Sequence, residues 1–135
     1  MITPEKLPEE KEAKYFIDMA WLPFRKRSFS ALGGSRLCPQ SQEGLRPTSA
    51  EEPEAILTTI KECCCQKENF IHIGQPVLES IFRLLLSNDN QPLSLAEIGY
   101  LLEKHRGMKP PPVSILERLL KKAEDYYGLR PVPGA

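Results

Sequence analysis

The most pronounced pattern of apolar residues lies just past the middle of the chain. Between Pro76 and Ser87 the apolar positions recur every three or four residues and widen to cover most of a helix, at Val77, Leu78, Ile81, Phe82, Leu84, Leu85 and Leu86. A helix that is apolar on nearly every side must be surrounded by other elements. The pattern therefore predicts a helix at the centre of a core.

A capping signal predicts where the next helix begins. Ser94 and Glu97 form a Ser-x-x-Glu capping box, in which each side chain satisfies a backbone N–H of the first turn. Apolar residues continue at helical spacing as far as His105, and Gly107 is suited to end the helix in a left-handed conformation. The sequence thus predicts both ends of this helix.

A second Ser-x-x-Glu sequence, Ser114 with Glu117, predicts the start of a last helix, which Gly128 ends. The intervening run Pro110–Pro112 favours an extended connection. After Gly128 the tail is long enough for one short edge strand at most.

The first half of the chain is less regular. A helix is predicted from Pro8 to Leu22, where Pro23 ends it, because apolar residues follow one helical face at Ala13, Phe16, Ile17, Ala20 and Trp21. Residues 23–47 lack periodicity and contain several Gly, Pro and Ser, which is typical of a functional loop or a linker. A further helix is predicted from about Pro53 to Cys65.

In its layout the second half resembles the winged-helix family. A core helix, two capped helices and a short extended segment follow one another between about Gly74 and Val132. The resemblance implies that the helix from Ser114 is a recognition helix for the DNA major groove. The connection from Gly107 to Val113 is longer than the usual turn, and the tail is too short for a hairpin wing, so a degenerate version is expected.

These elements predict a mainly α fold with a trihelical winged-helix-like C-terminal domain, an N-terminal helix and an irregular linker. We expect residues 1–47 to hold the N-terminal helix and a basic segment, residues 48–75 a cysteine-bearing helix and its connection, and residues 76–135 the winged-helix-like domain.

Charge argues against a protein attracted to nucleic acid over its whole surface. The 135 residues contain 18 Lys plus Arg and 18 Asp plus Glu, so an electrostatic partner must be recognised by a local patch. No apolar run approaches the roughly 20 residues of a transmembrane helix. With acids and prolines rather than an apolar segment at its N-terminus, the chain is expected to be cytoplasmic, with reduced thiols.

Two clusters are candidates for nucleic-acid contact. One lies in the basic segment, where cations alternate with Trp21, Phe24 and Phe29 and so could grip phosphates and stack on bases: Arg25, Lys26, Arg27 and Arg36. The other lies on the last helix: Arg118, Lys121 and Lys122. The alternative for both is structural: aromatic rings packed on the core in the first case, and a solvated helix surface with ion pairs in the second.

Soft ligands suggest a structural zinc site as a weaker hypothesis. Cys38, Cys63, Cys65 and His72 could supply four donors. The chain has no Cys-x2-Cys knuckle, however, and Cys63 and Cys64 fall on the apolar face of their helix, where cysteine behaves as a small hydrophobe.

The sequence accordingly predicts a small binding module and no enzyme, since no paired carboxylates, phosphate loop or catalytic triad is present. The leading hypothesis is a nucleic-acid-associated or regulatory role. The alternative is a protein-interaction subunit of a larger complex, for which Tyr126 and Tyr127 are candidate contacts. No cofactor other than zinc is indicated, and neither a membrane nor a small-molecule substrate is expected.

Overall fold

The computed structural model of the chain describes residues 13–26, 28–37, 53–66 and 70–132, without the side chains of residues 24, 25, 30 and 125. It is mainly helical, with a small antiparallel sheet of three strands. In chain order the elements are β1 (Lys14–Ile17), the 3₁₀ helix η1 (Leu22–Arg25), α2 (Phe29–Gly34), α5 (Pro53–Glu62), the 3₁₀ helix η2 (Cys64–Gln66), α6 (Val77–Ser87), β2 (Leu93–Ser94), α7 (Leu95–Arg106), α8 (Val113–Lys122), α9 (Glu124–Tyr127) and β3 (Leu129–Pro131).

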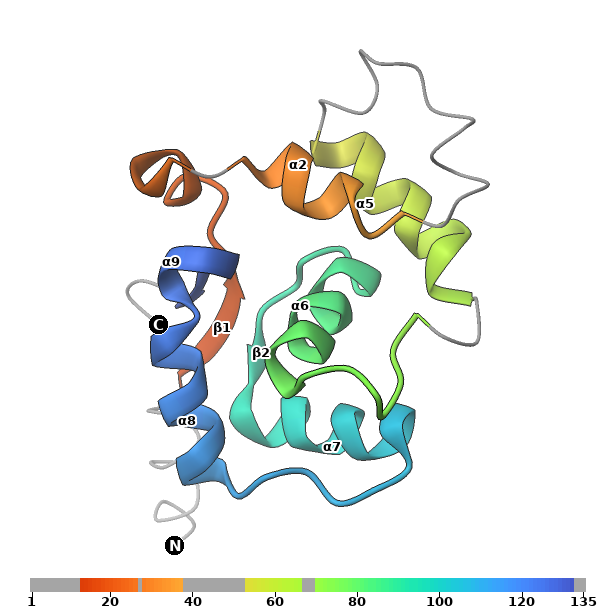
Figure 1. The fold of residues 1–135 in the computed structure, drawn as a ribbon, viewed down its shortest axis with the longest axis vertical. Helices are drawn as coiled ribbons and strands as arrows, with labels where there is room; N and C mark the ends of the chain where they lie inside the picture. Colours follow the sequence, from red (N-terminus) through yellow and green to blue (C-terminus); the bar gives the residue numbers. More distant parts are fainter. Residues whose placement is uncertain (1–12, 27, 38–52, 67–69, 133–135) are drawn as a thin grey trace, which may run out of the picture.

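Helix α6 lies at the centre of the molecule, as the apolar pattern predicts. In Figure 1 it is surrounded by α2 and α5 above, α7 below, and the sheet with α8 and α9 to the left. Its side chains Ile81, Phe82, Leu85 and Leu86 are fully buried. The predicted helix over 53–65 is also present, as α5 followed by the turn η2.

Both predicted ends of α7 are confirmed. The Oγ of Ser94 accepts a hydrogen bond from the Glu97 N–H at 3.1 Å, and the Glu97 carboxylate accepts one from the Ser94 N–H at 2.8 Å. Gly107 follows the helix with a φ of 75°, the left-handed conformation that glycine adopts without a steric penalty.

The last helix begins two residues earlier than its capping signal indicates. Pro112 occupies the N-cap position of α8, no side chain caps the helix, and Ser114 already lies exposed in its first turn, so the predicted Ser114–Glu117 capping box is wrong. Pro112 is extended, with a φ of −57° and a ψ of 155°, and the helix begins at the next residue. The proline run therefore leads directly into the helix.

The predicted N-terminal helix is wrong where the structure describes it, because Lys14–Ile17 form strand β1. β1 is the central strand of the sheet, with Tyr15 opposite Leu93 on β2 and Phe16 opposite Arg130 on β3. Both partners are distant in sequence, so tertiary pairing overrides the local helical spacing. β3 is the short edge strand that the tail predicts.

The segment predicted to be irregular contains short helices in its described part. Ser28 caps α2, its Oγ accepting the Ala31 N–H at 3.2 Å. Gly33 allows α2 to approach α5, since a Cβ there would lie 3.0 Å from the Cγ2 of Ile56. Residues 38–47 lie outside the described part of the chain.

Among the described residues, no helix is both long enough and apolar enough to span a bilayer.

Candidate nucleic-acid interface

Helix α8 carries three exposed cations on one side. Arg118, Lys121 and Lys122 are three or four residues apart, so at 3.6 residues per turn they lie within an arc of about 100°. We call these three residues the basic strip. None of them takes part in an ion pair between residues that the structure describes.

Two acidic residues of the C-terminal helices influence the sheet. Tyr15, on the central strand β1, has a pKa raised first by burial and then by the negative charges of Glu117 and Glu124. Both carboxylates are therefore close enough to β1 to act on Tyr15. Glu117 also precedes Lys121 by four residues and so lies at the edge of the basic strip, which keeps a net positive charge with its three cations.

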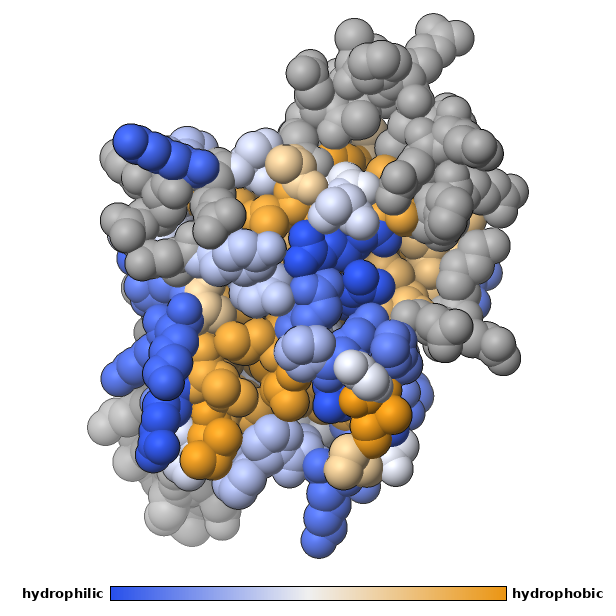
Figure 2. All heavy atoms as spheres, viewed as in Figure 1, coloured by the Kyte–Doolittle hydropathy of each residue, from blue (hydrophilic) through white to orange (hydrophobic). Residues whose placement is uncertain are grey.

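The side of α8 that packs on the protein is apolar. Leu116 and Leu120 are buried in the core, while Ile115 and Leu119 are half-buried. Figure 2 shows hydrophilic side chains in a column along α8, at the left of the view, directly beside a hydrophobic area. The exposed surface of α8 thus combines positive charge with neighbouring apolar contact area.

The structure describes the side chains of only two of the four cations in the basic segment near the N-terminus, Lys26 and Arg36. Lys26 is exposed at the end of η1, in a left-handed conformation with a φ of 57°. The side chain of Arg25 and the whole of Arg27 lie outside the described residues. Arg36 is half-buried and contacts α6 rather than solvent.

Two aromatic residues of that segment, Trp21 and Phe29, also contact the rest of the protein. Phe29 is buried in the core, and the guanidinium of Arg130 lies 4.1 Å from the centroid of the Trp21 ring while it pairs with Asp18 at 3.0 Å. Of the two predicted clusters, the structure exposes the one on α8 as a coherent surface.

Glu79 on α6 is the centre of an ionic network that the sequence analysis missed. Its carboxylate accepts hydrogen bonds from Arg36 at 2.7 and 2.9 Å, from Arg83 at 2.7 Å and from the Tyr127 hydroxyl at 2.9 Å. Burial would raise the pKa of Glu79, but the arginine hydrogen bonds outweigh it and lower the pKa to about 2. The sequence signal that could have predicted this network is that Glu79 is the single acid on the most apolar helix and has Arg83 four residues later.

Tyr126 and Tyr127 do not form one exposed pair. Tyr127 is half-buried against Phe82, with ring centroids 5.0 Å apart, and burial followed by its hydrogen bond to Glu79 raises its pKa to about 12. Tyr126 packs edge-on against Tyr127 and is 42% exposed. Tyr126 is therefore the tyrosine of the two that presents an open contact surface.

The proposed zinc ligands are not assembled within the described part of the chain, where no three His, Cys, Asp or Glu side chains are grouped as a metal site requires. Cys63 and Cys65 are half-buried, and the pKa of Cys65 is raised by burial, which opposes thiolate formation. His72 accepts the Gly74 N–H through Nδ1 at 3.1 Å. Cys38 lies outside the described residues, so the zinc hypothesis stays a prediction.

Comparison of the chain with protein-family models, with curated proteins and with solved structures finds no match. Function must therefore be inferred from the surface chemistry of the chain itself.

Proposed function

We propose that this chain is a small non-enzymatic binding module that contacts nucleic acid through the basic strip of α8. The observation that carries the proposal is the presence on one side of that helix of three exposed cations, none of which has an ion-pair partner among the described residues. Each cation is free to displace a counterion from a phosphate, which is the main source of sequence-independent affinity for nucleic acid.

The arrangement of elements supports a winged-helix-like version of this module. Helices α6, α7 and α8 follow one another, with β2 directly before α7 and β3 after α9. In this proposal α8 is the recognition helix, and β1 supplies the sheet strand that the short C-terminal tail cannot provide. Lys26, with Arg25 and Arg27 beside it in sequence, is proposed as a second phosphate contact.

The proposal is tested by fluorescence anisotropy of a labelled random-sequence duplex. The double variant Lys121→Glu with Lys122→Glu reverses the charge at two of the three positions of the basic strip. A charge-matched control, Lys61→Glu with Lys104→Glu, changes two exposed lysines on α5 and α7. We expect the wild-type protein and the control to bind at low salt, with a log–log salt slope of about −3 for three phosphate contacts, and the strip variant to bind far more weakly.

Two results would overturn the proposal. One is the absence of binding by the wild-type protein at low salt. The other is an equal loss of binding in the strip variant and the control, which would show that total charge rather than α8 decides the affinity.

A protein-interaction role is the second candidate, and exposed apolar side chains near α8 favour it. Met108 and Val113, at the two ends of the connection before α8, are 50% and 55% exposed, and Tyr126 is exposed after the helix. Leu129, which follows the two tyrosines, is fully buried and adds nothing to this surface. Stable complex formation that persists in high salt and is lost in Val113→Glu would support this role over nucleic-acid binding.

A further inference from the structure

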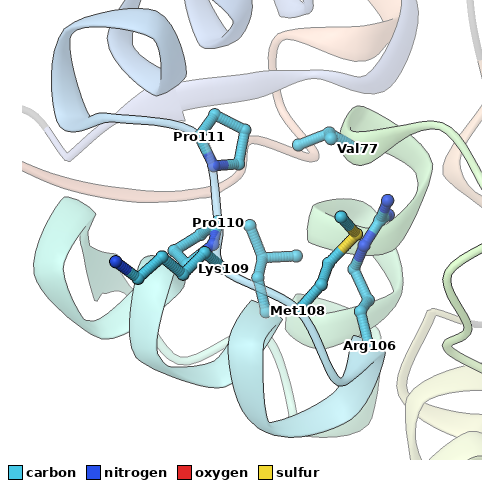
Figure 3. Close-up of a pocket in the computed structure, with 7 residues that line it drawn as sticks. Val77, Arg106, Met108, Lys109, Pro110 and Pro111 are labelled. Atoms are coloured by element: carbon cyan, nitrogen blue, oxygen red, sulfur yellow. The ribbon is translucent and has the colours of Figure 1, made fainter.

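A cavity of about 300 Å³ lies where the start of α6, the end of α7 and the connection 107–112 meet. Figure 3 shows the connection passing over the end of α7, with side chains from all three segments around the space. Most of the wall is apolar and comes from Val77, Leu102, Met108, Pro110 and Pro111. Its volume is at the lower end of the range for small-molecule sites, about 300–1,000 Å³.

The backbone around the cavity is set by residues with restricted or special conformations. Gly107 turns the chain in the left-handed region with a φ of 75°. Pro110 packs on α7, where a Cβ on Gly99 would lie 3.6 Å from its ring. Because prolines fix φ, the connection resists collapse into the space that it encloses. The site is thus largely pre-formed.

The polar part of the wall is entirely cationic. Arg106 and Lys109 both line the cavity, and no acidic residue does. Figure 3 shows the Lys109 side chain extending away from Arg106, with Met108 between the two. Lys109 is exposed and forms no ion pair with a described residue. A ligand in the cavity would therefore experience a positive potential.

Arg106 is half-buried and its charge is not neutralised by a carboxylate of the described chain. Its Nη1 donates to the Gln75 carbonyl at 2.9 Å and to the Ser80 hydroxyl at 2.8 Å, and its Nη2 donates to the Ile73 carbonyl at 3.4 Å. All three acceptors are neutral. A guanidinium has five N–H donors, so donors remain for an anion while the existing bonds hold the group in place.

We propose that this cavity binds a small amphipathic carboxylate whose apolar part is an aromatic ring. The proline and methionine walls provide contact area for the ring, since a thioether interacts favourably with aromatic groups. The remaining donors of Arg106 attract the carboxylate, and the charge of Lys109 adds to a positive potential that disfavours a cation. The site is separate from the basic strip and does not depend on nucleic-acid binding.

The test uses 3-phenylpropanoate as a probe, with the neutral 3-phenylpropan-1-ol and the cationic 3-phenylpropylamine as matched controls. The chain has three methionines, so the methyl resonances in a carbon–proton NMR spectrum are few, and Met19 is an internal control remote in sequence from the cavity. We expect the carboxylate to shift the Met108 methyl signal and not that of Met19. We also expect it to bind at least about fivefold more tightly than the alcohol, the effect of one partly exposed charge interaction.

Two variants of Met108 distinguish the effect of charge on ligand binding from the effect of side-chain shape. Met108→Glu places a carboxylate at the exposed edge of the cavity, while Met108→Gln has nearly the same size without charge, and neither removes a hydrogen bond of Arg106. By ligand-observed NMR we expect the Glu variant to bind 3-phenylpropanoate about tenfold more weakly than the Gln variant. Equal affinities of the two variants, equal binding of carboxylate and alcohol, or an unchanged Met108 signal in the wild-type protein would each overturn the proposal.

Discussion

Arg36, two residues after the end of α2, forms a bidentate ion pair with Glu79 on the central helix α6, 43 residues later. Its Nη2 lies 2.7 Å from Oε1, and its Nε lies 2.9 Å from Oε2. The guanidinium also lies over the Phe82 ring, 5.1 Å from its centroid. Arg36, which the sequence suggested as a phosphate ligand, therefore connects the N-terminal segment to the core.

We expect Glu79→Gln to lower the free energy of unfolding by about 2–4 kcal/mol, because it leaves Arg36 and Arg83 half-buried without their counter-charge. Urea unfolding measures the effect. Glu103→Gln, an exposed position on α7, is the matched control and should change stability by less than about 0.5 kcal/mol. Equal stability of the two variants would show that the network does not stabilise the fold.

The same network predicts a dependence on acid pH. The pKa of Glu79 is about 2 in the folded protein and 4.5 ordinarily, so the unfolded state takes up this proton first as the pH falls. The contribution of Glu79 is complete above pH 4.5 and is lost as the pH falls from there through about 2. Urea unfolding at successive pH values should therefore show the wild-type advantage over Glu79→Gln shrinking across this range; a constant difference would contradict the prediction.

The two Ser-x-x-Glu sequences should respond differently to alanine. Ser94→Ala removes the cap of α7 and should cost about 1 kcal/mol. Ser114→Ala lies in the first turn of α8, caps nothing and should be neutral or slightly stabilising, since alanine has the higher helix propensity. Thermal unfolding of both variants provides the comparison. A loss at Ser114 as large as that at Ser94 would restore the capping box that the structure lacks.

Gly128 should be far less replaceable than Gly34. Its φ is 71°, and a Cβ there would lie 2.8 Å from the Cγ of Leu22, so we expect Gly128→Ala to cost about 1–3 kcal/mol. Gly34 lies in α2, where a Cβ would meet no neighbouring atom within 4 Å, and Gly34→Ala should raise stability by up to about 1 kcal/mol. Chemical denaturation that ranks the two variants in the opposite order would contradict the close contact between η1 and the end of α9.

The candidate interface was partly predictable from sequence. Spacings of three and four residues place Arg118, Lys121 and Lys122 on one side of a helix whatever surrounds it. The proximity of Glu117 and Glu124 to Tyr15 was not predictable, because it depends on the position of Tyr15 in the sheet. The cavity at Arg106 was missed because its walls come from segments about 30 residues apart in sequence, Val77 and the connection after α7.

The sequence by itself determined the central helix α6, both ends of α7 and the stop at Gly128, because hydrophobic spacing, capping hydrogen bonds and glycine conformations act within a few residues. Only the tertiary structure decided that Lys14–Ile17 form a strand and that Arg36 binds Glu79. The local sequence of Lys14–Ile17 is compatible with a helix or a strand, and Arg36 could equally face solvent or bind a carboxylate. The pairing of β1 with β2 and β3, and of Arg36 with Glu79 on α6, decides between these alternatives, and those partners come into position only when the whole chain folds.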